Sequence, residues 1–125
     1  MNHDPTELAD LAVTAARAAG ELLLERRKGP LEVHTKSSAT DVVSDADRDA
    51  EDTVRAMVSA ARPDDAVLGE ESGTHTGSSG LRWVVDPLDG TVNYLYGRAD
   101  WAVSVAVENA EHVLAAAVYL PRRGE

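Results

Sequence analysis

Apolar side chains recur at three- and four-residue steps through the first part of the chain, which is the spacing of an amphipathic helix. The pattern predicts a helix over residues 5–28. Asp4 can cap its amino end and Pro5 suits its first position, while Gly29 and Pro30 end it. The small alanine side chains in this stripe predict close packing against a neighbouring element.

A second helical pattern follows a short polar segment. Residues 31–36 alternate like a strand, and residues 36–40 have the composition of a loop or turn. Apolar positions then keep helical spacing and predict a helix over residues 45–61, with Ser44 or Asp45 as its cap. The helix dipole explains the acidic residues near this helix start without any chemistry.

The second half of the chain contains the short apolar and alternating runs that are typical of β-strands. We predict strands at Ala66–Leu68 and Leu81–Asp86, and a hairpin of Trp101–Glu108 with Val113–Leu120 joined by residues 109–111. Residues 73–80, between the first two strands, are rich in Gly, Ser and Thr, which predicts a mobile surface loop.

Length and composition indicate a single domain with one core. The chain has 125 residues and 43% hydrophobic content, and it lacks Phe, so its two Trp and three Tyr must supply the aromatic bulk. Cysteine is also absent, which excludes disulfides and thiolate chemistry and fits a reducing compartment. No apolar run approaches the roughly 18 residues of a membrane span, so we expect a cytoplasmic protein that does not contact membranes.

The charge balance limits the classes of partner. The 22 acidic and 12 basic residues give a formal charge of −10, which repels the phosphate backbone of nucleic acids. We therefore expect no nucleic-acid partner. An anionic small-molecule substrate requires a local reversal of the field, and a bound divalent cation is the simplest means of achieving it.

The segment Trp83–Asn93, with the sequence WVVDPLDGTVN, carries most of the candidate chemistry. An apolar run leads to Asp86, Pro87 keeps Asp86 extended, and the glycine after Asp89 permits a sharp turn. The two carboxylates and the carbonyl of Leu88 can then face one point, and Mg²⁺ prefers such oxygen ligands. The alternative is a plain Asp-Pro turn followed by a solvent-exposed Asp-Gly bend.

Two adjacent glutamates, Glu70 and Glu71, follow the predicted strand at residues 66–68. They offer a third carboxylate from a strand end. Taken alone, such a pair is ordinarily charge that faces solvent. Its interpretation as a metal ligand depends on its position before the Asp86 segment.

These motifs occur in a characteristic order along the chain. In sequence they are Lys36-Ser-Ser, Asp41, Asp47, Leu68-Gly-Glu-Glu-Ser and Trp83-Val-Val-Asp-Pro-Leu-Asp-Gly-Thr-Val-Asn. The set closely resembles the inositol monophosphatase family over essentially the whole chain. The resemblance implies an α/β fold, a layered sandwich of helices and a mainly antiparallel sheet. It also implies Mg²⁺-dependent, lithium-sensitive hydrolysis of a phosphate monoester, typically inositol monophosphate, by a metal-activated water.

The resemblance also implies a set of metal ligands. The residues that match the first metal site of the family are Glu70, Asp86 and the Leu88 carbonyl, and those that match the second are Asp86 and Asp89. Asp86 would thus bridge two ions. Glu70 would also contact a third, weaker metal through water.

The same resemblance assigns the catalytic and substrate-binding positions. Thr91, hydrogen-bonded to Asp47, would help to activate the attacking water, and the backbone amides of Gly90 and Thr91 would meet the phosphate. The implied catalytic residues are Glu70, Thr91 and Asp47, and the implied substrate-binding residues are Glu70, Leu88, Asp89, Gly90 and Thr91.

The chain also departs from the family pattern. Family members are about twice as long, and their second half supplies another aspartate to the second metal. We therefore interpret residues 1–125 as the amino-terminal part of such a phosphatase domain. By itself it is expected to bind divalent ions weakly and to turn over slowly or not at all. Its open sheet edge predicts self-association, with a homodimer as one form.

Two questions stay open at the level of sequence. Histidinol phosphate, fructose bisphosphate and 3′-phosphoadenosine phosphate are rival substrates within the same family, because the residues that separate them lie largely in its second half. A different class is a non-catalytic fragment that binds metal or a partner protein, since an open sheet edge favours pairing.

Overall fold

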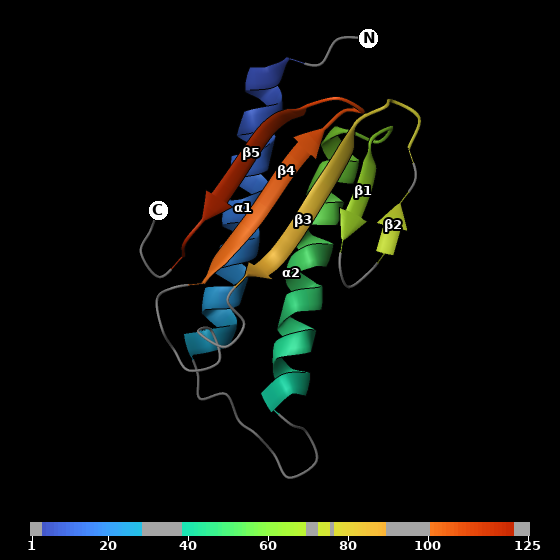
Figure 1. Cartoon of the computed structure of the whole chain (residues 1–125). Helices are drawn as coiled ribbons and strands as arrows, with labels where there is room; N and C mark the ends of the chain where they lie inside the picture. Colours follow the sequence, from blue (N-terminus) through green and yellow to red (C-terminus); the bar gives the residue numbers. More distant parts are fainter. Residues whose placement is uncertain (1–3, 29–38, 70–72, 76, 90–100, 122–125) are drawn as a thin grey trace.

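The computed structural model describes residues 4–28, 39–69, 73–75, 77–89 and 101–121. In this part of the chain two helices cover one face of a five-stranded sheet (Figure 1). The helices are α1 (Pro5–Lys28) and α2 (Ala39–Ala61), and the strands are β1 (Ala66–Gly69), β2 (Gly73–His75), β3 (Arg82–Asp89), β4 (Ala102–Glu108) and β5 (Val113–Tyr119).

The strands follow one another across the sheet in the order β2-β1-β3-β4-β5. β1 and β3 are parallel, and the other neighbouring pairs are antiparallel. This arrangement confirms the predicted layered α/β fold with a mainly antiparallel sheet. Because β1 and β3 run in the same direction, their carboxyl ends lie side by side at one end of the sheet (Figure 1).

Helix α1 begins and ends where the sequence predicts. The Asp4 carboxylate accepts a hydrogen bond from the Thr6 backbone N–H at 2.8 Å, which confirms Asp4 as the cap. The buried stripe consists mostly of alanine, with Leu8 and Leu23 near its two ends. Neither described helix is apolar enough over a sufficient length to cross a bilayer.

Small side chains let α1 approach the sheet closely. A Cβ atom at Gly20 would lie 2.5 Å from the ring of Tyr119, so this position has no room for even a methyl group. The Tyr119 hydroxyl donates to Glu21 at 2.8 Å, and the Arg17 guanidinium lies 5.6 Å from the ring centre. These contacts fix the end of β5 on α1.

The core lies between the helices and the sheet. Its largest members are Trp83 on β3 and Trp101 just before β4, which are 0% and 1% exposed, as the absence of Phe predicts. Around them the inward positions of β4 alternate with half-buried ones, which is the period-two pattern of a strand with one covered face. Helix α2 contributes Ala46, Ala50, Val54 and Val58 to the same core.

The predicted start of the second helix is wrong. α2 begins at Ala39, so positions 44 and 45 lie inside it and not at its amino end. Ser and Asp differ from good helix formers by only a few tenths of a kcal/mol per residue, about 0.5, so a helix supported by tertiary packing continues through them. The strand predicted at residues 31–36 lies outside the described residues.

The mobile loop predicted for residues 73–80 is also corrected by the structure. β2 pairs with β1 in an antiparallel register that runs from Gly69 with Gly73 to Val67 with His75. Further on, the backbone N–H groups of Ser78 and Ser79 donate to the Asp64 carbonyl at 2.8 and 3.0 Å. Residues 73–75 therefore form a strand on the β1 edge, and Ser78 and Ser79 are bonded to the turn that follows α2, although the composition of this segment is typical of a loop.

The strand predictions are confirmed with small shifts. β1 ends one residue later than predicted, at Gly69, and β3 continues past Asp86 to Asp89. The β4–β5 hairpin turns where predicted, and its geometry is set by the Asn109 carboxamide. That side chain accepts hydrogen bonds from the backbone N–H groups of Glu111 at 2.8 Å and His112 at 2.7 Å.

Candidate functional site

The carboxyl ends of β1 and β3 are brought together by their parallel register. Leu68 lies opposite Val84 and Gly69 lies opposite Val85. The next residue on β3 is Asp86, and the next residue in the chain after Gly69 is Glu70, which lies outside the described residues. Two segments that are far apart in the sequence and that both carry predicted metal ligands are therefore aligned at one end of the sheet.

A bulge re-aims the end of β3 at this point. Asp86 pairs with Ser104, and Asp89 pairs with Ala102, so β3 spends one residue more than β4 over the same interval. Pro87 has no N–H to give to a ladder, and a bulge is one of the few places where a sheet accepts it. The bulge lies within the DPLDG sequence, so the backbone departs from regular pairing where the metal ligands are predicted.

An open groove of about 360 Å³ lies against this end of the sheet and is lined by Leu68, Gly69, Val84, Val85 and Asp86. Asp86 is the acidic residue of that lining and is half-buried. A carboxylate beside apolar side chains is less screened than one in water, so it attracts a cation more strongly. The Leu88 side chain is 5% exposed, which anchors the backbone that carries the predicted carbonyl ligand.

Helix α2 adds two acidic residues on one of its faces. Asp47 is half-buried, and Glu51, four residues later, is completely buried. The Glu51 carboxylate occupies the space beside the Gly69 backbone, because a Cβ at Gly69 would come within 2.3 Å of its Oε1 atom. Arg55 Nε donates to Glu51 Oε2 at 3.3 Å.

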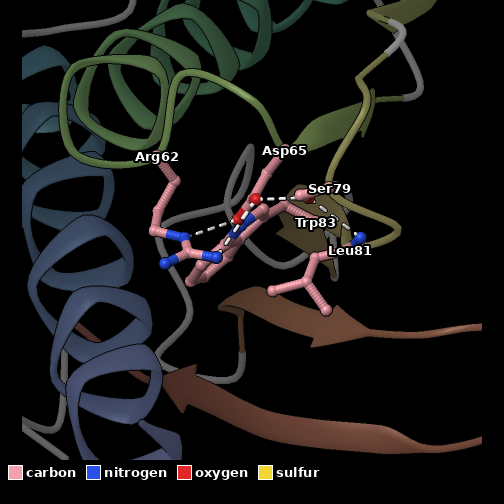
Figure 2. A network of polar contacts seen from close by, with 5 residues as sticks. All are labelled: Arg62, Asp65, Ser79, Leu81 and Trp83. Carbon is pink, nitrogen blue, oxygen red and sulfur yellow. Dashed lines mark hydrogen bonds and ion pairs between the residues drawn. The ribbon is translucent and has the colours of Figure 1, made fainter. Parts of the chain in front are cut away.

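A different acidic residue, Asp65, lies where β1 and β3 begin. Figure 2 shows Arg62, Ser79 and Trp83 converging on its carboxylate. The donors are Arg62 Nε at 2.8 Å, Ser79 Oγ at 2.6 Å and the Trp83 indole N–H at 2.8 Å, and Asp65 itself is 2% exposed. Ser79 Oγ in turn accepts from the Leu81 N–H at 3.1 Å.

The surroundings of Asp65 determine its ionisation. Burial alone would raise the pKa of Asp65, but the hydrogen bonds from Arg62, Ser79 and Trp83 and the charge of Arg62 outweigh it and lower that pKa. The hydrogen bond to Asp65 likewise raises the pKa of Arg62 against the opposing effect of burial. Asp65 is therefore ionised and accepts from donors in the residue that follows α2, the segment before β3 and β3 itself, which is the arrangement of a structural anchor.

The structure places only part of the predicted site. Asp86, Leu88 and the backbone of Asp89 lie at the end of β3, and Asp47 lies on α2. Glu70, Gly90 and Thr91 lie outside the described residues, so their predicted roles stay predictions. Over the described part of the chain no three His, Cys, Asp or Glu side chains gather in a cluster suited to a metal.

The Asp86 segment offers ligands that fit a hard divalent ion. A carboxylate and a backbone carbonyl two residues later are both oxygen donors, and the bulge separates them from regular strand pairing. The donor set contains no sulfur or imidazole, which would favour zinc or copper. The chemistry of the described residues thus agrees with the predicted Mg²⁺ site.

Sequence reasoning missed two buried acids, Glu51 and Asp65. A helical projection could have found Glu51, because it lies beside the buried stripe that includes Ala50 and Val54. No comparable pattern marks Asp65, which lies in a short connection after Pro63. Its donors come from residues up to 18 positions away in the chain, and only the fold brings them together.

Comparison with known proteins gives a consistent result. A family model described as the inositol monophosphatase family matches residues 4–125. Inositol-1-monophosphatase of Mesorhizobium japonicum is 43% identical over 122 residues, which are 94% of this chain and 45% of that protein. Histidinol-phosphatase of Chlorobaculum parvum is 37% identical over 118 residues, which are 92% of this chain and 44% of that protein.

A solved structure shows the same fold. The crystal structure of extragenic suppressor protein suhB from Bartonella henselae superposes with a TM-score of 0.80 at 39% identity. The match includes 95% of this chain and 46% of the length of that protein. The chain thus spans less than half the length of these relatives.

Proposed function

The chain belongs to the inositol monophosphatase family, and we propose that it supplies most of the metal site of a Mg²⁺-dependent phosphatase that hydrolyses inositol monophosphate. The observation that carries this proposal is the register of β1 and β3. It aligns Gly69, which precedes Glu70, with Val85, which precedes Asp86. The family relationship supports phosphatase chemistry in general, and the aligned carboxylate segments support a metal-dependent form of it.

The proposed ligands are Asp86, the Leu88 carbonyl, Asp89 and Glu70. Bound Mg²⁺ would lower the pKa of a coordinated water and neutralise the charge that builds up on the phosphate and leaving oxygens. Asp86 is proposed to serve two ions at once, since it lies at the point where β3 leaves its regular pairing. The buried Leu88 side chain holds the adjacent backbone, so its carbonyl can keep a fixed direction.

Other residues of the chain are proposed to handle the water and the phosphate. Asp47 would accept a hydrogen bond from the Thr91 hydroxyl, and that hydroxyl would orient the attacking water. The backbone amides of Gly90 and Thr91 would donate to phosphate oxygens and so offset the −10 charge of the chain locally. No protein nucleophile is needed in this scheme.

The identity of the substrate is the least constrained part of the proposal. Relatives of similar identity are named as inositol-1-monophosphatase and as histidinol-phosphatase. We favour inositol monophosphate because it is the typical substrate that the resemblance to the family implies. A histidinol-phosphate, fructose-bisphosphate or 3′-phosphoadenosine-phosphate phosphatase is the second candidate, and a non-catalytic metal- or partner-binding fragment is the third.

The proposal is tested on the full-length phosphatase, of which this chain is proposed to form the amino-terminal part. Phosphate release is measured from inositol 1-phosphate, histidinol phosphate, fructose 1,6-bisphosphate and 3′-phosphoadenosine 5′-phosphate, with Mg²⁺ and with EDTA. We expect the largest kcat/KM for inositol 1-phosphate, complete dependence on Mg²⁺ and inhibition by lithium. Full activity in EDTA would contradict the metal mechanism. A higher kcat/KM for another ester would move the assignment to that substrate, and metal binding without any turnover would support the non-catalytic alternative.

A further inference from the structure

We propose that Glu51 is a positioning residue for the metal site, because its buried carboxylate braces the end of β1 at Gly69, the residue before the predicted ligand Glu70. This inference rests on the proposed function and extends it to a residue on α2. Its basis is the contact between a helix side chain and a strand backbone, together with the burial and charge of that side chain.

The contact is close enough to fix the strand end. A Cβ built on Gly69 would lie 2.3 Å from Glu51 Oε1 and 2.4 Å from its carboxyl carbon. The carboxylate therefore fills the space that any other residue at position 69 would need. Gly69 is itself buried, so the strand cannot move away from the helix into solvent at this point without opening the core.

The chemistry of Glu51 is unusual for a residue that only fills space. Its side chain is 0% exposed, and Arg55 Nε lies 3.3 Å from Oε2 with a side chain that is 17% exposed. A buried ion pair is often no more stabilising than apolar side chains of similar volume. A cation bound nearby would stabilise the negative charge of Glu51, which lies against the backbone that leads into Glu70.

The position of Glu51 on α2 supports the same role. Asp47, which is proposed to act on the attacking water through Thr91, precedes it by one helical turn and lies on the same face. Helix α2 would then serve the site twice, through Asp47 for the water and through Glu51 for the β1 end. Residues that orient metal ligands typically affect metal affinity about 10- to 100-fold when they are replaced.

The test is the affinity of the chain for Mn²⁺, used as a paramagnetic substitute for Mg²⁺ and followed by electron paramagnetic resonance of the free ion. We expect Glu51→Gln to weaken Mn²⁺ binding by about 10-fold or more. Asp52→Asn is the matched control, because it removes the same charge from the next, exposed position of α2. We expect Asp52→Asn to change the affinity by less than about twofold, since exposed charges are screened.

A second variant keeps the test valid if Glu51→Gln folds poorly. Gly69→Ala leaves the acid in place but pushes a methyl group into its position, so we expect a similar loss of Mn²⁺ affinity. In a Glu51→Ala background the same change should have less effect, because the space is then free, and the two losses should not add. Thermal unfolding of each variant is measured first. Binding is then compared at a temperature at which every variant is folded.

The outcomes separate this inference from the proposed function. No saturable Mn²⁺ binding by the wild-type chain, or wild-type binding by Asp86→Asn, would contradict the metal site and this inference with it. If Asp86→Asn loses binding while Glu51→Gln and Gly69→Ala bind as tightly as the wild type, only the role of Glu51 is wrong. A loss in both variants with an unchanged Asp52→Asn control supports it.

Discussion

Asp65 and Glu51 are both buried acids beside β1, but they lie at opposite ends of the β1–β3 pair. Asp65 lies where the strands begin and accepts from Arg62, Ser79 and Trp83 at 2.6 to 2.8 Å. Glu51 lies where they end, against Gly69 and with Arg55 at 3.3 Å. The same functional group at the same level of burial therefore has two different surroundings.

The difference shows how a buried carboxylate can be assigned to stability or to function. Around Asp65 strong donors from separate elements converge, so the charge is neutralised within the fold and ties those elements together. Around Glu51 the neighbouring backbone leads directly to predicted metal ligands. Burial alone does not distinguish the two cases, but the identity of what each acid touches does.

The largest expected effect is at the functional end. In the full-length protein, Asp86→Asn should reduce Mg²⁺-dependent phosphatase activity to near background, because one substitution loosens two proposed ions. This loss should exceed the roughly 10³-fold effect of removing a single charge-stabilising group. Steady-state kinetics at millimolar Mg²⁺ measure it, with thermal unfolding as a check that the fold is retained. Turnover at the wild-type level would exclude the bridging role.

Thr91→Ala should lower kcat more than it lowers metal affinity. The hydroxyl is assigned to the attacking water and not to the ions, and positioning of this kind contributes about 10² to 10⁴ in rate. The check is a pair of measurements, kcat with saturating Mg²⁺ and the Mg²⁺ concentration that gives half-maximal activity. Equal losses in the two would argue against this assignment.

At the other end of the strands, Asp65→Asn should affect stability without affecting metal binding. An amide cannot accept from every donor around it, and breaking a buried ion pair costs roughly 3 kcal/mol or more of unfolding free energy. Denaturant unfolding measures the loss, and Mn²⁺ affinity of the folded variant should equal that of the wild type. A matching loss of Mn²⁺ affinity would mean that the two ends are not independent.

The lowered pKa of Asp65 gives a pH dependence of known sign. A carboxyl group with a lower pKa in the folded state stabilises the fold above its unfolded pKa, about 3.9, and this contribution is lost as the pH falls through the folded pKa. The wild type should therefore lose stability below about pH 4 more steeply than Asp65→Asn. Identical acid unfolding curves for the two proteins would contradict the assignment of that pKa.

The smallest effect is expected at an exposed acid, Glu21, which serves as a reference for the two buried ones. Tyr119→Phe removes its hydrogen bond from the tyrosine hydroxyl while the ring and its packing remain. Such an exposed bond contributes about 0.5 to 1 kcal/mol. The same bond raises the pKa of Tyr119, so a spectroscopic titration of the wild type should show that shift. If Tyr119→Phe lost as much stability as Asp65→Asn, burial would not explain the difference between the exposed and the buried acid.

Much of the local structure could be predicted from the sequence. Helix α1, the β4–β5 hairpin and the strand that leads to Asp86 each combine an apolar period with capping or turn residues. The bounds of α1 are those predicted, and the strands differ from theirs by at most three residues. Signals of this kind depend on residues that are near one another in the chain. The bulge between Asp86 and Asp89 lies within the DPLDG motif, but it was not predicted from the sequence.

Other features were decided by tertiary contacts. The start of α2 was wrongly predicted, because packing outweighs the weak local preference at Ser44. The strand β2 was missed, because pairing with β1 outweighs the loop-like composition of the segment 73–80. The hydrogen bonds of Ser79 and Trp83 to Asp65 and the contact of Glu51 with Gly69 join residues 14 to 18 positions apart in the chain. Periodicity and spacing carry no record of such contacts. The sequence by itself therefore determined most of the elements and the candidate site residues, whereas the tertiary structure alone decided which acids are buried and what each of them contacts.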